Sequence, residues 1–382
     1  MASSSLPFDL VEDIISRVPI ESLIRFKRTS KQWYALCNDK RFIYKHLGLS
    51  KKRLMRIYLD KVEIINPATL DLLCLPVPAE FSSVAQSFLM YVIHCNGLLL
   101  CRWYNGRGPR YGDVAVWNPV LGQVKFVESS SHQLTDIYGF GYDKNNRDSY
   151  KILRISRWYL EAGEFEIYDF KSKLWRVFSA TLDWSMPYPY LNVSLNGNMY
   201  WIAETKGNRN PKRFIQGFDF SKETFKRISW FPFEVRQSGI GRAIIDTVAI
   251  SGFRGDRLSL FRQRFGDETR EMEVWVTNKV TDGVVLWSKY FNVARPDLPI
   301  LNPHFFEYAH INVPSFFTDK TDSIVLWCDK VVGEDYACTS FYEIGQGGIK
   351  IQVTGQPFRG KGERNPCLSN FVYVPSLVPV PE

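Results

Sequence analysis

The stretch Val114-Ala115-Val116-Trp117-Asn118-Pro119 decides the fold, because versions of it recur along the chain. Each version is a short apolar strand that ends in Asn or Asp and is followed by a turn. The other copies are residues 62–67, 165–169 and 215–219, so that successive copies begin 52, 51 and 50 residues apart. A period near 50 residues indicates a repeat architecture in which each unit is one small sheet.

The turns between strands form a second series with the same period. Each joins two apolar runs and is built from Asn, Gly, Asp or Arg, a composition typical of tight β-hairpin turns that need positive φ. These turns are Asn96-Gly97, residues 145–148, Asn196-Gly197, residues 254–256 and residues 319–322. Both series lengthen together after residue 230, which indicates insertions in the later units without a change of fold.

Each unit is predicted to be a four-stranded antiparallel sheet, with strands a to d in chain order. The second unit has its strands at residues 90–95, 98–103, 114–118 and 123–127, and four complete units follow it. Residues 54–76 supply only strands b, c and d, and residues 370–374 supply a lone strand. If the two chain ends share one sheet, the result is a closed six-bladed β-propeller with a kelch-like period.

The first fifty residues follow a helical pattern instead. Apolar residues three and four apart predict four short helices, with Pro19 between the first two. Thr29 or Ser30 can cap the third helix, and Asp39 the fourth. Helices this short cannot bury their apolar surface among themselves, so we expect a partner to complete the bundle. The predicted fold class is therefore α+β, with a helical domain at residues 1–50 and an all-β propeller at residues 51–382.

The helical residues resemble an F-box. The resemblance rests on residues 6–27, which read LPFDLVEDIISRVPIESLIRFK, on Ser30-Lys31-Gln32-Trp33 and on residues 42–47. The spacing and the N-terminal position are similar to those of the large plant family that joins an F-box to an F-box-associated, kelch-like domain. Ser30 stands where that family often has Cys. Residues 138–143 and 150–153 resemble the second domain of the family, in a looser match.

The resemblance implies docking onto the SKP/ASK-type adaptor of a cullin-based, SCF-type ubiquitin ligase. The positions that match the family's adaptor-facing or core positions are Leu6, Pro7, Leu10, Ile14, Leu23 and Ile24. The propeller would then bind a target protein for ubiquitination. On this interpretation the chain is a non-catalytic substrate receptor that needs no cofactor and no metal.

Composition and charge limit the alternatives. The 382 residues are 45% hydrophobic and 15% aromatic, which favours short strands joined by turns. Of the net charge of +8, most lies in residues 1–53, which hold eleven basic and five acidic side chains. This distribution argues against nucleic-acid binding over the whole surface. Seven Cys without a C-x-x-C pair, and the lack of a leader or a long apolar run, predict an intracellular protein, cytoplasmic or nuclear, without membrane contact.

Two other functions stay open, a propeller enzyme and a basic nucleic-acid-binding protein. The enzyme is disfavoured because the five His lie in different units at no metal-ligand spacing. His94 and Cys95 are neighbours, but alternate residues of a strand point to opposite faces. The Gly-rich fragments lack the strand-to-helix context of a phosphate-binding loop. Nucleic-acid binding is disfavoured because no stripe of Lys and Arg occurs outside the helical domain.

Loop lengths predict which face of the propeller binds a target. The a–b and c–d turns lie at one end of each blade and are short, whereas the b–c and d–a connections lie at the other end and are long. The helical domain joins the short-turn face, so the target is expected at the long-loop face. Candidate contacts are the Arg, Lys and aromatic side chains typical of interface hot spots: Trp103, Tyr104, Arg107, Arg110, Tyr111, Arg157, Trp158, Tyr159, Arg209, Lys212 and Arg213. Their charge favours an acidic or phosphorylated segment.

Overall fold

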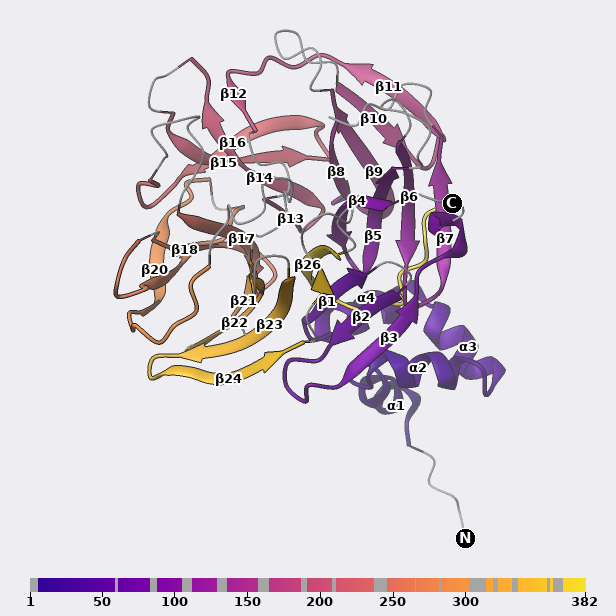
Figure 1. Cartoon of the computed structure of the whole chain (residues 1–382). Coiled ribbons are helices and arrows are strands. Elements are labelled where there is room, and N and C mark those ends of the chain that lie inside the picture. The colour runs from indigo at the N-terminus through magenta and orange to yellow at the C-terminus, as the bar shows by residue number, and fades with distance from the viewer. Residues whose placement is uncertain are drawn as a thin grey trace.

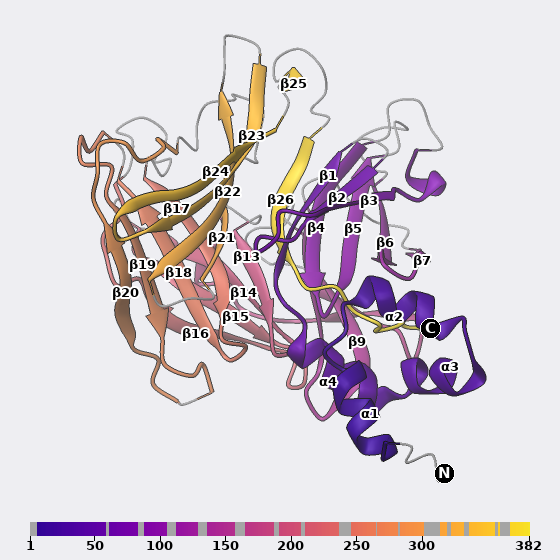
Figure 2. The same cartoon turned by 90° about the horizontal axis from the view of Figure 1, so that it is seen from below.

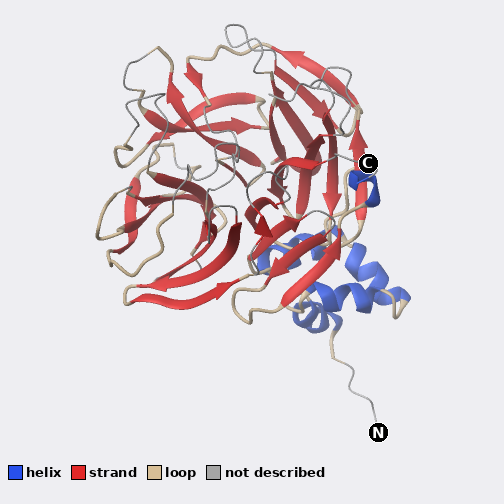
Figure 3. Cartoon of the chain, viewed as in Figure 1, coloured by secondary structure: helices blue, strands red, loops and turns tan. Residues whose placement is uncertain are grey.

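Four short helices precede six β-sheets that are arranged around a common centre (Figures 1 and 3). The structure is a computed structural model, and it describes residues 6–58, 61–82, 88–104, 112–128, 136–156, 165–186, 191–207, 211–236, 246–264, 266–281, 283–301, 314–318, 322–331, 336–355, 358–359 and 367–382. The predicted fold, a helical segment followed by a six-bladed propeller, is confirmed. Among the described helices, none is long and apolar enough to cross a membrane.

The helices begin at the signals expected from the sequence. They are α1 (Phe8–Ile15), α2 (Ile20–Lys27), α3 (Lys31–Asn38) and α4 (Lys40–Leu49). Pro7 and Pro19 directly precede α1 and α2. The side chains of Ser30 and Asp39 accept hydrogen bonds from the backbone N–H groups of Trp33 and Phe42, at 3.2 and 3.0 Å, and so cap α3 and α4.

The six blades each have strands a to d running from the centre to the rim. Blade 1 consists of β26 (Cys367–Tyr373), β1 (Arg53–Tyr58), β2 (Lys61–Ile65) and β3 (Leu72–Pro76). Blade 2 consists of β4 (Phe88–Cys95), β5 (Leu98–Tyr104), β6 (Gly112–Asn118) and β7 (Gln123–Val127). Blade 3 consists of β8 (Ile137–Asp143), β9 (Asn146–Ile155), β10 (Phe165–Asp169) and β11 (Leu174–Phe178).

The later blades follow the same plan with additions. Blade 4 consists of β13 (Asn192–Leu195), β14 (Asn198–Thr205), β15 (Arg213–Asp219) and β16 (Thr224–Trp230), and β12 (Trp184–Ser185) also pairs with β14. Blade 5 consists of β17 (Thr247–Phe253), β18 (Arg257–Gln263), β19 (Met272–Thr277) and β20 (Trp287–Val293). Blade 6 consists of β21 (Ser315–Phe317), β22 (Ser323–Val331), β23 (Tyr336–Gly345) and β24 (Gly348–Thr354), and β25 (Phe358–Arg359) also pairs with β23. A 3-10 turn, η1 (Ala79–Ser82), lies between blades 1 and 2.

The two ends of the chain close the ring in blade 1. β26 pairs antiparallel with β1, from Arg53 opposite Tyr373 to Tyr58 opposite Cys367. The closing strand thus begins at residue 367, three residues before the start expected from its apolar run. The sequence pattern does not reveal the extra pairs because Ser369-Asn370 interrupts the apolar run, and the pairing register shifts between Met55 and Ile57.

In blades 2, 3 and 4 the Asn or Asp at the end of strand c caps the turn that follows. Asn118 accepts hydrogen bonds from the backbone N–H groups of Val120 and Leu121 at 3.0 and 3.1 Å. Asp169 and Asp219 accept equivalent bonds two residues on, from Lys171 at 2.8 Å and Ser221 at 2.9 Å. These side-chain oxygens take the place of a backbone carbonyl in the turn, which explains why Asn or Asp recurs at this position of the repeat units.

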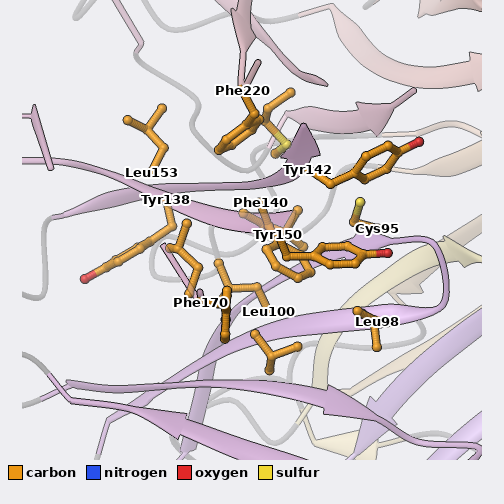
Figure 4. Close-up of a cluster of buried hydrophobic side chains, with 14 of the residues drawn as sticks. Cys95, Leu98, Leu100, Tyr138, Phe140, Tyr142, Tyr150, Leu153, Phe170 and Phe220 are labelled. Atoms are coloured by element: carbon orange, nitrogen blue, oxygen red, sulfur yellow. The ribbon is translucent and has the colours of Figure 1, made fainter. Parts of the chain in front are cut away.

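The core lies between neighbouring blades. Figure 4 shows one such region, in which Leu98 and Leu100 of blade 2 and Phe140 and Tyr150 of blade 3 are among the labelled side chains. Gly141 permits the closest approach to blade 4, because a Cβ at this position would overlap the Phe220 ring and the Gly197 carbonyl oxygen. The blades therefore form one continuous, tightly packed ring.

Candidate functional site

The first candidate surface is the outer face of α1, which has its amphipathicity reversed. Glu12 points inward and is only 5% exposed, and its carboxylate pairs with Arg41 at 2.8 Å and Lys45 at 3.2 Å on α4. Leu10 and Ile14, by contrast, are 52% and 57% exposed. Monomeric proteins rarely hold a contiguous apolar face toward water unless another molecule covers it. The arrangement makes this face a candidate docking surface.

The structure separates the six adaptor candidates into two groups. Leu6, Pro7, Leu10 and Ile14 are exposed around α1. Ile24 is half-buried on α2, and Leu23 is completely buried in the core of the helical domain. Helical spacing put Leu23 and Ile24 on one face, but it could not say whether that face meets the other helices or a partner. Leu23 serves the core of the domain.

A second exposed apolar group lies at the end of α2 and on α3, and the sequence analysis did not single it out. Phe26 is 40% and Tyr34 is 58% exposed. The Phe26 ring packs edge-on against half-buried Trp33, with ring centroids 6.4 Å apart, and the Lys27 ammonium lies 5.3 Å from the Tyr34 ring centroid. Aromatic rings beside a cation are typical of interface hot spots. The sequence could have indicated this group, because Phe26 and Tyr34 fall on the sides of their helices where polar residues are expected.

The helical domain lies at the end of the propeller that carries the a–b turns (Figure 2). The Tyr44 hydroxyl on α4 lies 3.0 Å from the Asp148 carboxylate and 3.1 Å from the Arg147 carbonyl oxygen, both at the start of β9. Lys40 forms an ion pair with the same Asp148. Arg53 at the start of β1 pairs with Glu21 of α2. The docking face of α1 is thus held on the short-turn side, away from the b–c and d–a connections.

The second candidate surface, at the long-loop end, falls largely outside the described residues. Arg107, Arg110, Tyr111, Arg157, Trp158, Tyr159 and Arg209 lie outside them altogether. For Trp103 and Tyr104, the structure places the backbone at the end of β5 and does not describe the side chains. Lys212 is exposed just before β15.

Arg213 differs from the expectation of a loop residue open to a target. It is the first residue of β15, is 7% exposed, and lies 3.5 Å from the Glu204 carboxylate. The reason is that strand β15 already begins at Arg213, a residue that the sequence pattern assigned to the preceding loop. The Arg213 guanidinium therefore pairs with Glu204 inside the blade.

Arg213 belongs to a set of Arg–Glu pairs that the sequence analysis missed. Each pair joins strands b and c of one blade, close to the long-loop end: Arg56–Glu63, Arg154–Glu166, Glu204–Arg213 and Arg262–Glu273. Burial alone would raise the pKa of Glu273, but Lys289 at 2.6 Å and Arg262 at 2.9 Å hold it below its usual range. In blades 3, 4 and 5 such pairs lie at the strand ends from which a long b–c connection leaves, whereas in blade 1 the connection is only residues 59–60.

Neither His94 nor Cys95 has the properties of a catalytic group. The two backbone N–H groups of Gly97 and Val374 donate to Nε2 of His94, at 2.9 and 3.3 Å, and burial lowers the pKa of this His to about 4. Burial raises the pKa of the Cys95 thiol to about 12, so that it is not a thiolate at neutral pH. Across the ranges that the structure describes, no group of three or more His, Cys, Asp or Glu is placed to hold a metal ion.

Comparisons with known proteins agree with this organisation. The model of the F-box domain matches residues 3–45, and the model of the F-box associated beta propeller domain matches residues 48–380. The Arabidopsis thaliana protein named "Putative F-box protein At1g77650" is 62% identical over all of both chains. "F-box/WD-40 repeat-containing protein 1" of the same plant is 42% identical over 99% of this chain and 90% of its own. A solved nidogen/laminin complex, at 12% identity and a TM-score of 0.43, covers 85% of this chain and 100% of its own and carries no argument about function.

Proposed function

The chain belongs to the family of F-box proteins that carry an F-box associated β-propeller domain, and we propose that it is a non-catalytic substrate receptor of an SCF-type ubiquitin ligase. The F-box binds an SKP/ASK-type adaptor and, through it, a cullin. The propeller binds a target protein inside the cell. The contribution of the chain to ubiquitination is to hold the target near the charged conjugating enzyme, which raises the effective concentration of the target lysine.

The observation that carries this proposal is the reversed face of α1. Its exposed residues Leu10 and Ile14 sit on a helix whose buried side is pinned through Glu12 to α4. The apolar side is therefore presented in a fixed orientation, so α1 loses little conformational freedom when a partner covers it.

Binding of a purified SKP-type adaptor tests the adaptor half of the proposal. Leu10→Asp/Ile14→Asp should abolish binding, because it places two charges in an apolar interface. Leu10→Ala/Ile14→Ala removes three of the four carbons of each side chain. Because these side chains are 52% and 57% exposed in the free chain, about half of their surface is left to be buried on binding, and the expected loss is ~2 kcal/mol or roughly 30-fold in Kd. The matched control is Leu174→Asp/Val177→Asp on β11, where the wild-type residues are 66% and 65% exposed on the propeller.

The control variant should bind the adaptor as well as the wild type does. Adaptor binding that is undiminished in Leu10→Asp/Ile14→Asp, with the F-box still folded, would remove the basis for the adaptor role. Affinity capture with and without residues 1–50 then identifies proteins that bind the propeller alone, which tests the target half.

A further inference from the structure

The last nine residues, 374–382, form a segment that we call the C-terminal strap. It leaves β26 at the short-turn end and runs to the outer strand of blade 2, so that the C-terminus lies next to β7 (Figure 1). Seen from below, it runs toward the side on which the helices lie (Figure 2). Chain termini are usually exposed and poorly ordered. Here Ser376 is completely buried, and Leu377 and Val378 are each 2% exposed.

One side of the strap is bonded to blade 2. The Asn118 side-chain amide donates to the carbonyl oxygens of Ser376 at 3.1 Å and Val378 at 2.8 Å. Further along, the Val380 N–H donates to Gln123 Oε1 at 3.1 Å. The Val374 N–H donates to His94. The strap is thus fixed to blade 2 through the ends of β4 and β6 and the start of β7.

The other side of the strap belongs to the apolar core that continues into the F-box. Leu377 and Val378 are members of the same cluster of buried side chains as Leu23 of α2 and Phe42 of α4, and this cluster also contains Leu98 of blade 2. A shared apolar core fixes relative orientation, because its members pack closely and leave no room for sliding.

The remaining described contacts between the F-box and the propeller are polar and differ in burial. The side chains of the Arg53–Glu21 pair are 16% and 28% exposed, and Tyr44, which bonds to Asp148, is half-buried. In the Lys40–Asp148 pair the side chains are 75% and 43% exposed. Ion pairs that face water contribute little to the free energy of a contact and are screened by salt. The strap adds to these polar contacts two aliphatic side chains, Leu377 and Val378, that are almost completely buried.

We propose that the C-terminal strap is the positioning element that fixes the F-box on the propeller and so sets the direction from the adaptor to the target. The claim that the strap sets the direction from adaptor to target rests on the proposed function. The claim that it fixes the F-box on the propeller does not. In a receptor, a fixed direction determines which target lysines reach the conjugating enzyme, because small misplacements lower the rate of a positioned reaction steeply.

A glycine that contacts the strap, Gly97, allows a test variant with a matched control in another blade. Gly97 lies in the a–b turn of blade 2 at φ +83°, and a Cβ there would overlap Ser376 and come within 2.9 Å of the Val374 carbonyl oxygen. Gly255 occupies the same turn position in blade 5 at φ +81°, with nothing within 4 Å of an added Cβ. Gly97→Ala and Gly255→Ala therefore carry the same backbone strain. Only the first displaces the strap.

Pulsed electron paramagnetic resonance between two spin labels measures the orientation directly. We would label Tyr34→Cys on α3 and Leu174→Cys on β11, both exposed, in a full chain in which Cys74 and Cys367 are replaced by Ser. We expect a single narrow distance in the wild type and in Gly255→Ala. We expect loss of the single distance, with a several-fold broader distribution, in Gly97→Ala.

A second variant keeps the test decisive if Gly97→Ala does not fold. Deletion of residues 375–382 removes the strap and leaves β26 paired with β1, so the ring stays closed. This variant should also show the broad distribution. A narrow distance in every folded strap variant would overturn the proposal. Adaptor binding is measured separately on the same samples, so that failure of the strap proposal is distinguishable from failure of the adaptor role.

Discussion

Mild acid should weaken the propeller in part through His94. Its Nε2 accepts the N–H groups of Gly97 and Val374, and its ring packs edge-on against Tyr373 with centroids 5.2 Å apart. A proton on Nε2 would break both hydrogen bonds at once. The surroundings therefore favour the neutral imidazole, and burial lowers its pKa to about 4.

The size and sign of the effect follow from linkage. In the unfolded chain the pKa of His is about 6.5, so the unfolded state takes up a proton before the folded state does as the pH falls. The stabilisation is fully present above about pH 6.5 and is lost progressively toward about pH 4. For these two pKa values the loss is ~2 kcal/mol at pH 5 and approaches ~3 kcal/mol at lower pH.

Urea unfolding at pH 7.5 and pH 5.0, followed by tryptophan fluorescence, measures this loss in the wild type and in His94→Gln. The amide oxygen of Gln can accept the same N–H groups and does not titrate. Carboxylates such as Glu63 and Glu273 also lose stabilisation on acidification, but they do so equally in both proteins and cancel in the difference. The wild type should lose ~2 kcal/mol more than His94→Gln between the two pH values. Equal losses would refute the reasoning.

Three further predictions concern closure, the F-box core and the target face. Deletion of residues 368–382 exposes the edge of β1 and should cause aggregation or loss of a cooperative melt; a truncated chain that melts like the full one would mean that the terminus is only a tail. Leu23→Asp should reduce helical circular dichroism by unfolding the F-box, whereas exposed Leu10→Asp should not, and equal losses would contradict their assignment to the core and the outer face. Replacing three arginines of the long loops by Ala should abolish target capture and preserve adaptor binding. If capture survives this change and is lost instead when the short-turn face is mutated, the target binds the short-turn face and our choice of face is wrong. The three are Arg107, Arg110 and Arg157.

The features that the sequence predicted well are local ones. The blade strands and the helix caps depend on alternation, on turn residues such as Asn96-Gly97, and on Ser30 and Asp39, all of which act within a few residues. Closure by the C-terminal strand was also predictable, because a count of strands left one unit incomplete at each end of the chain. In both cases the reasoning needed no knowledge of distant contacts.

The features that it missed depend on contacts between distant parts of the chain. The burial of the strap results from Asn118 bonding to Ser376 and Val378, which a local pattern of Val, Pro and Leu cannot reveal. Glu12 is buried because Arg41 and Lys45 of another helix reach it. For the same reason a helical pattern alone could not assign Leu23 to the core and Leu10 to the surface.

Closure of the ring and seating of the F-box are consecutive steps along one segment of chain. β26 completes blade 1 by pairing with β1, and the next residues form the strap, which is bonded to blade 2 and whose Leu377 and Val378 belong to the apolar cluster that includes F-box residues. The strap can reach Asn118 only when β26 is in place, since Tyr373, whose hydroxyl donates to the Gly97 carbonyl oxygen at 3.2 Å, is the last residue of the closing strand. A propeller with an open ring would therefore also hold its F-box loosely. The fold thus couples the integrity of the propeller to the orientation of the F-box.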